Sequence, residues 1–165
     1  MSTTKSGTQS AADRRTAETE LKRLVAKFSP DAASLVATVR RWLRKRLPAA
    51  HELVYEYRDC FVVSVSPTDR GYEGAFALRG AADGVRLYFN AGKALKDPLK
   101  LLRGPGTKAR YLELEGPSTL SRDGVDALFD QAVARTIVPF ARTGRGPVII
   151  QSVKTGPNAK KRKAK

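Results

Sequence analysis

The hydrophobic pattern of the chain changes its period at Pro48, and this change constrains the fold more than any other feature. Before Pro48, apolar residues recur every three or four positions, which predicts one amphipathic helix over 13–28 and a second over 30–47. Ser29 is typical of a helix N-cap and Pro30 of a first helical position. Beyond Pro48 the period is two, which predicts strands.

Turn residues divide the alternating region into strands. Arg58-Asp59 and Asp83-Gly84 are typical of tight turns between paired strands. The predicted strands cover 52–57, 60–66, 72–79, 85–90 and 110–115. Helical spacing returns over 121–138, with Ser121 as the expected N-cap, and the apolar segment 146–154 is either an edge strand or an ordered arm.

Helices on both sides of a run of adjacent strands predict an α+β fold. We expect a two-layer sandwich in which an antiparallel sheet of about five or six strands carries the N-terminal and C-terminal helices on one face. A length of 165 residues with 41% hydrophobic residues fits one domain. The expected division is a disordered lead over 1–12, the domain over 13–140, and a basic arm with a disordered tail over 141–165.

Two observations bear on the compartment. No apolar run reaches the roughly 18 residues of a membrane-spanning helix, so no membrane partner is expected. Cys60 is the single cysteine and cannot close an intramolecular disulfide, which favours a reducing compartment. We therefore expect a cytoplasmic protein.

The formal net charge of +15 is the strongest compositional signal. About half of the excess lies in 141–165, which contains eight Lys and Arg residues and no acidic residue. Basic surfaces attract polyanions with little sequence specificity, although solubility alone also explains such a tail. The residues predicted to contact a polyanion are the cations of one face of the second helix and those of the tail: Arg40, Arg41, Arg44, Lys45, Lys160, Lys161, Arg162 and Lys163.

The segment LLRGPGTKAR, residues 101–110, resembles a phosphate-binding loop at first sight. It formally fits the dinucleotide pattern G-x-G-x-x-A, but that pattern needs a following helix, and here a strand follows. A weaker hypothesis remains, in which the cations and the glycine amides of this loop surround an anion. The candidate anion-binding residues are Arg103, Gly104, Gly106, Lys108 and Arg110. The alternative is a structural loop with solvated cations, in which Arg110 pairs with a carboxylate.

No catalytic signature, cofactor site or metal site is predicted. His51 and Cys60 are the strongest candidate ligands, and neither belongs to a paired spacing. Cys60 begins an apolar strand, which favours an inert buried thiol. The aromatic residues suited to base stacking lie mostly in strands, where packing in the core or on a sheet face explains them. They are Tyr55, Tyr57, Tyr72 and Tyr88.

From Leu21 to Val133 the chain resembles the YdhG-like domain family, a bacterial group of mostly unknown function. The resemblance rests on three segments in order, over 24–56, 84–114 and 125–134. The positions of the middle segment that match the family pattern are Gly92, Leu95, Asp97, Pro98, Leu101, Leu102, Gly104, Gly106 and Arg110. The resemblance implies a sandwich related to the frataxin fold.

Some members of that family are described as intracellular iron chaperones, and iron handling of the frataxin type uses carboxylates along the first long helix. Here the corresponding helix carries arginines, with Asp31 alone at its start. The sequence therefore favours a non-enzymatic binding or accessory module for an anionic partner, either nucleic acid or an acidic protein. An iron chaperone is the alternative, by resemblance only.

Overall fold

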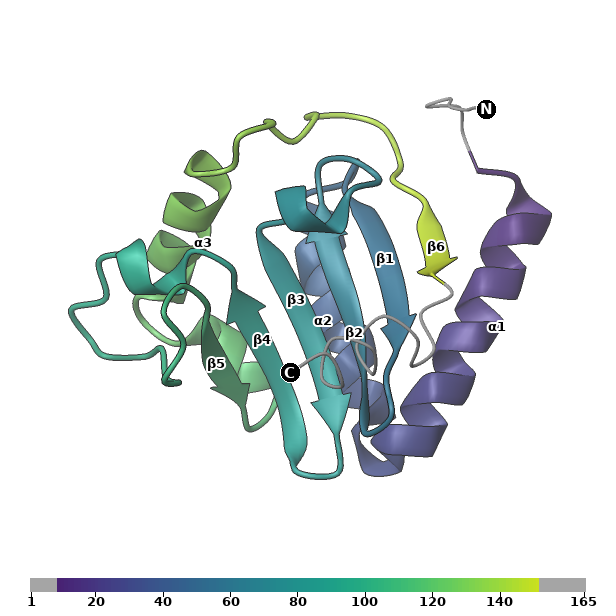
Figure 1. Ribbon diagram of the computed structural model, residues 1–165, viewed down its shortest axis with the longest axis horizontal. Coiled ribbons are helices and arrows are strands. Elements are labelled where there is room, and N and C mark those ends of the chain that lie inside the picture. The colour runs from purple at the N-terminus through teal and green to yellow at the C-terminus, as the bar shows by residue number, and fades with distance from the viewer. Residues whose placement is uncertain (1–8, 152–165) are drawn as a thin grey trace, which may run out of the picture.

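The computed structural model describes residues 9–151, which form a six-stranded sheet and three α-helices (Figure 1). The helices are α1 (Ala11–Phe28), α2 (Ala33–Arg46) and α3 (Val125–Ala134). The strands are β1 (His51–Glu56), β2 (Cys60–Ser66), β3 (Phe76–Ala81), β4 (Gly84–Phe89), β5 (Arg110–Leu114) and β6 (Val148–Gln151). The predicted α+β class and two-layer architecture are confirmed.

The strand order is β5-β4-β3-β2-β1-β6. Strands β1 to β5 pair antiparallel with their neighbours in sequence, whereas β6 lies parallel to β1. The sheet is therefore mixed, and the expectation of a wholly antiparallel sheet is wrong for this one strand. A long connection from α3 crosses the end of the sheet and brings β6 to β1 in the parallel direction (Figure 1).

Strand β6 also corrects the expected division of the chain. It belongs to the segment 141–165 that we predicted to be an arm and tail, and it completes the sheet, so the domain extends past residue 140. At the other end, the predicted lead over 1–12 includes the start of α1, which begins at Ala11. The tail cations Lys160, Lys161, Arg162 and Lys163 lie outside the described residues.

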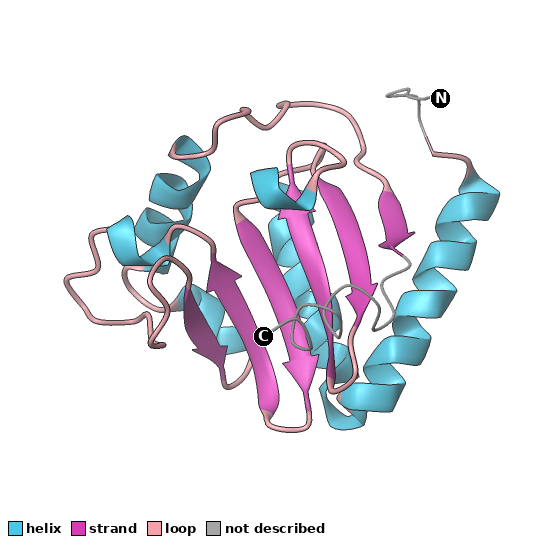
Figure 2. Ribbon diagram, in the orientation of Figure 1, coloured by secondary structure: helices cyan, strands magenta, loops and turns pink. Residues whose placement is uncertain are grey.

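The core lies between one face of the sheet and the helices. Figure 2 shows α2 behind the strands, with α1 at the β6 end and α3 at the β5 end. Each helix contributes a buried apolar stripe to a single hydrophobic cluster, which also contains Phe61, Phe76 and Phe89 from the central strands. Because side chains alternate along a strand, the intervening residues of the same strands face the opposite side of the sheet.

One of the two predicted helix caps is wrong. Ser29 and Pro30 hold the predicted N-cap and first positions, in a 3-10 turn (Pro30–Ala32) that leads into α2. The Ser29 hydroxyl makes no capping bond and instead donates to Ala81 O at 3.0 Å, which joins the helix connection to β3. Ser121 closes a short 3-10 turn (Pro117–Ser121), and α3 begins only after Gly124. Gly124 has a φ of 92°, a left-handed conformation that separates the turn from the helix and favours glycine.

Candidate anion-binding site

The cations of α2 do not form one solvent-facing surface. Arg41 and Lys45 are exposed, but Arg40 retains only 11% of its side-chain exposure and Arg44 is half-buried. Residues four apart lie on one side of a helix, and this side of α2 faces α1 and β1. The prediction of a single cationic face is therefore wrong for Arg40 and Arg44.

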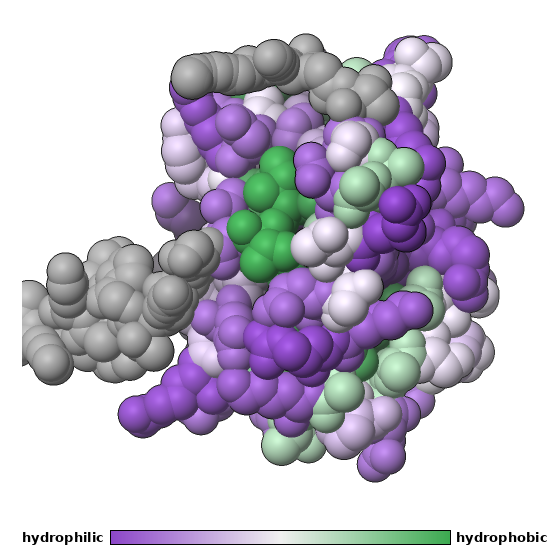
Figure 3. Space-filling model, turned by 90° about the vertical axis from the view of Figure 1, so that its right-hand side faces the viewer, coloured by the Kyte–Doolittle hydropathy of each residue, from purple (hydrophilic) through white to green (hydrophobic). Residues whose placement is uncertain are grey.

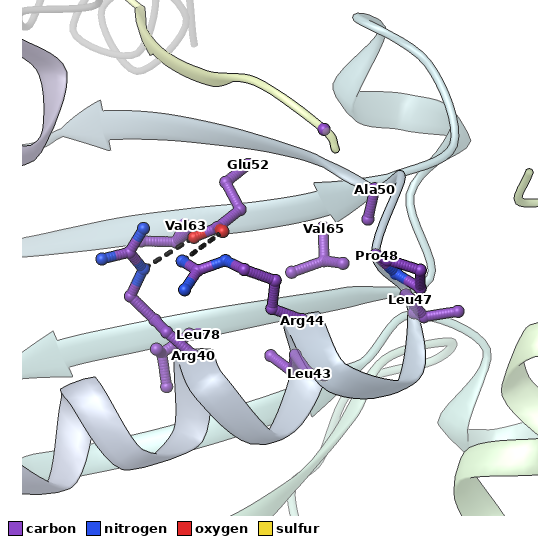
Figure 4. Close-up of a pocket in the computed structure, with 11 residues that line it drawn as sticks. Arg40, Leu43, Arg44, Leu47, Pro48, Ala50, Glu52, Val63, Val65 and Leu78 are labelled. Atoms are coloured by element: carbon purple, nitrogen blue, oxygen red, sulfur yellow. Dashed lines mark hydrogen bonds and ion pairs between the residues drawn. The ribbon is translucent and has the colours of Figure 1, made fainter. Parts of the chain in front are cut away.

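Both buried arginines are paired with carboxylates. Arg40 Nε donates to Glu52 Oε1 at 2.6 Å, and Arg44 Nη2 donates to Glu52 Oε2 at 2.8 Å (Figure 4). The other two nitrogens of Arg40 donate to the two oxygens of Glu18, each at 2.8 Å. This set of four residues, the buried charge network, joins α1 through Glu18, α2 through both arginines and β1 through Glu52.

All three nitrogens of Arg40 donate to carboxylates, and the buried charge network leaves little space. Its cavity of about 10 Å³ accommodates one water molecule at most. Burial lowers the pKa of Arg40, but its hydrogen bond to Glu18 and the charge of Glu52 outweigh burial, so the pKa is raised overall. The hydrogen bond from Arg40 lowers the pKa of Glu18. Both shifts favour the ionised forms of Arg40 and Glu18, which suits a structural ion pair rather than proton transfer or anion binding.

The second cationic region is the loop segment 91–110, named here the basic loop. It contains six Lys and Arg residues and one acidic residue, Asp97. Its ordered backbone rests on α3, since Lys96 N donates to Gln131 Oε1 at 2.8 Å and Gln131 Nε2 donates to Lys96 O at 3.0 Å. The Asp97 carboxylate accepts from the backbone amides of Leu101 and Leu102 at 2.9 and 2.8 Å. Its charge is thus used to order the loop.

The glycines of the basic loop have structural roles. Arg103 and Tyr111 exchange two backbone hydrogen bonds of 2.8 and 2.9 Å. Gly104 follows with a φ of 114°, and a Cβ there would lie 3.0 Å from the Tyr111 ring, so only glycine suits this position. Arg110 Nε donates to Gly106 O at 3.1 Å, so the expected alternative of a carboxylate partner for Arg110 is wrong. Arg110 therefore stabilises the basic loop through a hydrogen bond between two of the loop's own residues.

An open cleft of about 470 Å³ lies at the base of the basic loop. It is lined by Asn90, Ala91, Lys93, Ala94, Thr107 and Lys108. Lys93 N donates to Lys108 O at 2.8 Å, which ties the two sides of the cleft together. Of the predicted anion-binding residues, only Lys108 lines this cleft. Sequence analysis missed Lys93 and Thr107, and the signal that could have found Lys93 is the charge imbalance over 91–110.

Most of the cationic side chains of the basic loop are exposed and have no carboxylate partner. Five of the six are solvent-exposed and make no ion pair with any residue of the described range 9–151: Lys93, Lys96, Lys100, Arg103 and Lys108. The sheet places the loop at the β5 end, far from the buried charge network between α1, α2 and β1 (Figure 1). The basic loop is therefore the candidate site for an anion.

The α1 side of the molecule offers a different surface. Viewed from that side, the surface is hydrophilic around a compact hydrophobic patch (Figure 3). A groove of about 350 Å³ between α1 and α2 is lined mainly by apolar residues, among them Leu21, Val25, Val36 and Ala37. Lys22 and Arg40 also line this groove, but Arg40 is already bound to Glu18 and Glu52. The groove therefore offers an anion fewer unpaired cations than the basic loop does.

Other reactive groups are few in the described part of the chain. Burial raises the pKa of the Cys60 thiol, which disfavours the reactive thiolate. Burial lowers the pKa of His51, whose Nδ1 has no hydrogen-bond partner among residues 9–151. Within that range, no three His, Cys, Asp or Glu side chains are grouped so that they could hold a metal ion.

Among the same residues, no helix has both the length and the apolar character needed to cross a membrane.

No family model, no curated protein and no solved structure matches this chain. The most distinctive feature of the described surface is the group of exposed cations of the basic loop that have no carboxylate partner within 9–151.

Proposed function

We propose that the protein is a non-enzymatic binding module for an anionic partner, which it contacts through the basic loop. The observation that carries this proposal is the contrast between paired and unpaired cations. Arg40 and Arg44 are neutralised within the fold, whereas the five exposed cations of 91–110 have no carboxylate partner in the described range. The basic tail predicted from the sequence adds charge of the same sign.

Physical chemistry supports a polyanion as the partner. Like charges held close together repel one another and hold a concentrated population of counterions nearby. A phosphate-rich or carboxylate-rich partner relieves the repulsion, and the release of counterions from a nucleic acid favours binding at low salt. The loop is also pre-ordered by Asp97, Gln131 and Arg110, so little conformational entropy is lost on binding.

The proposal also includes the compartment and the family of the protein. A cytoplasmic accessory protein related to the YdhG-like family is consistent with the sequence resemblance and with a single free cysteine. The iron-chaperone alternative gains no donor cluster from residues 9–151. Calorimetry with ferrous and ferric iron tests this alternative directly, and stoichiometric iron binding would support it.

The test is a salt titration of binding to duplex DNA of about 20 base pairs. Lys93→Ala with Lys108→Ala removes two charges from the cleft, and we expect the slope of log affinity against log salt to become shallower by about 1.8. The matched control is Arg15→Ala with Lys22→Ala, which removes two exposed charges from α1 that make no ion pair within 9–151.

The control pair is expected to change the slope by much less than the cleft pair. If both pairs change it equally, binding follows net charge and the basic loop is not the site. If the wild-type protein binds neither duplex DNA, single-stranded DNA nor heparin at low salt, the proposed function is wrong.

A further inference from the structure

The aromatic residues of the chain are divided between the two faces of the sheet. All six phenylalanines and the single tryptophan belong to the hydrophobic core or pack against it. None of the five tyrosines does. They are Tyr55, Tyr57, Tyr72, Tyr88 and Tyr111, and they lie on or beside the face opposite the helices.

Strand register places three of these tyrosines, and a ring contact places a fourth. Tyr55 alternates with its core-facing neighbour Val54 and so faces the opposite side of the sheet. Tyr57, just beyond β1, stacks on Tyr55 with the ring centroids 6.2 Å apart. Tyr88 and Tyr111 are direct partners across β4 and β5, with their ring centroids 5.2 Å apart. This face therefore carries one pair of rings at β1 and another across β4 and β5.

The fifth tyrosine lies on a short 3-10 helix, Gly71–Glu73, which covers part of the same face. Gly71 is packed against the Tyr55 hydroxyl, where a Cβ would lie only 2.6 Å from the oxygen, and Gly74 is packed against Ser64. Tyr72 itself is 81% exposed. A large aromatic side chain so exposed contributes little to packing, and such residues are often binding contacts.

The tyrosine face and the basic loop are continuous. The Tyr111 ring lies against Gly104 of the loop, and Arg86 stacks over the same ring at 4.3 Å from its centroid. Asn90, which lines the cleft beside Lys93 and Lys108, donates through Nδ2 to Gly74 O at 2.7 Å, next to the Tyr72 segment. Tyr111 therefore positions the loop, while the other tyrosines extend the surface away from it.

We propose that the anionic partner is a single-stranded nucleic acid, whose phosphates contact the basic loop and whose bases stack on Tyr72, Tyr88 and the Tyr55–Tyr57 pair. This inference rests on the proposed function and names its ligand class. Tyr72 is exposed, and Tyr55, Tyr57 and Tyr88 are partly exposed. A cationic track beside accessible aromatic rings is the arrangement that binds single strands without strong sequence preference. A duplex hides its base faces, and an acidic protein offers no bases to stack.

The first experiment needs no variant. It compares the affinity of the full chain for a single strand of about 12 nucleotides with its affinity for an oligomer of the same length and charge made of abasic units. Each stacked base is worth about 5- to 150-fold in affinity, so we expect the base-bearing strand to bind at least about tenfold more tightly. Equal affinity for the two oligomers overturns the inference and leaves the proposed polyanion binding intact.

The second experiment removes the rings. Tyr72→Leu with Tyr88→Leu should lower affinity for the single strand by about tenfold or more, leave the salt slope unchanged, and leave abasic-oligomer binding unchanged. Tyr72→Phe with Tyr88→Phe keeps both rings and should retain wild-type affinity. Loss of affinity in the phenylalanine variant alone, or equal loss for both oligomers in the leucine variant, would contradict base stacking. Absence of binding to either oligomer by the wild type would overturn this inference, and the proposed function would fail with it only if duplex DNA and heparin also did not bind.

Discussion

At the residue scale, three arginines of this chain have different roles because of their neighbours. Arg40 lies between two carboxylates and is committed to the fold. Arg110 donates to Gly106 O and orders the basic loop. Arg103 has backbone hydrogen bonds, while its exposed side chain has no ion pair within 9–151. The count of cations in a segment therefore says less about binding than the distribution of carboxylates around them.

The buried charge network makes a stability prediction. Glu52→Ala is expected to lower the free energy of unfolding by about 3–5 kcal/mol, because it leaves Arg44 without its carboxylate and Arg40 with only one. The control is Glu115→Ala, which removes the exposed partner of Arg122 and should change stability by no more than about 1 kcal/mol. Urea denaturation measures both values. Similar values for the two variants would show that the network contributes no more than a surface pair.

At the element scale, the sequence predicted most of the secondary structure and little of how its parts meet. The hairpins follow from local turn residues such as Asp83-Gly84, and the helices follow from apolar spacing. The parallel pairing of β6 could not be predicted, because it depends on where a connection of many residues ends. The ion pairs of Arg40 were also not predicted, because the apolar spacing of a helix does not show which carboxylates of other elements lie beside it. Here those carboxylates are Glu18 and Glu52.

The basic loop is ordered by hydrogen bonds between its own residues, and the Asp97 carboxylate accepts two of them. Asp97→Ala removes the acceptor of the Leu101 and Leu102 amides, so we expect faster hydrogen exchange at both amides and a loss of about 1.5–3 kcal/mol in stability. The variant also gains one unit of positive charge. If pre-ordering matters, polyanion affinity falls despite that gain.

Hydrogen exchange and DNA affinity measured on the same Asp97→Ala sample separate the two effects. Higher affinity together with faster exchange would show that net charge, and not loop order, controls binding. Asp130→Ala on the exposed surface of α3 is the control for the change of charge alone, because Asp130 makes no ion pair within 9–151.

At the scale of the whole molecule, the two ends of the described chain meet at one edge of the sheet. Gln9 accepts a hydrogen bond from Val148 N at 3.0 Å and donates to Val148 O at 2.7 Å, so one side chain replaces the missing neighbour of edge strand β6. Arg14 Nη2 donates to Gly146 O at 2.7 Å. Gln9 and Arg14 therefore hold the start of the described chain against Gly146 and Val148.

The same edge is connected to the buried charge network, since Glu52 N donates to Pro147 O at 2.9 Å. Gln9→Ala should therefore loosen β6 and raise the exchange rate of the Val148 amide by about tenfold, because that amide loses its only acceptor within 9–151 and becomes solvated. The Leu87 amide, in the middle of β4, should exchange at its original rate. If both amides accelerate together, β6 opens only with the whole domain, and Gln9 then contributes to global stability rather than to a local closure of the sheet edge.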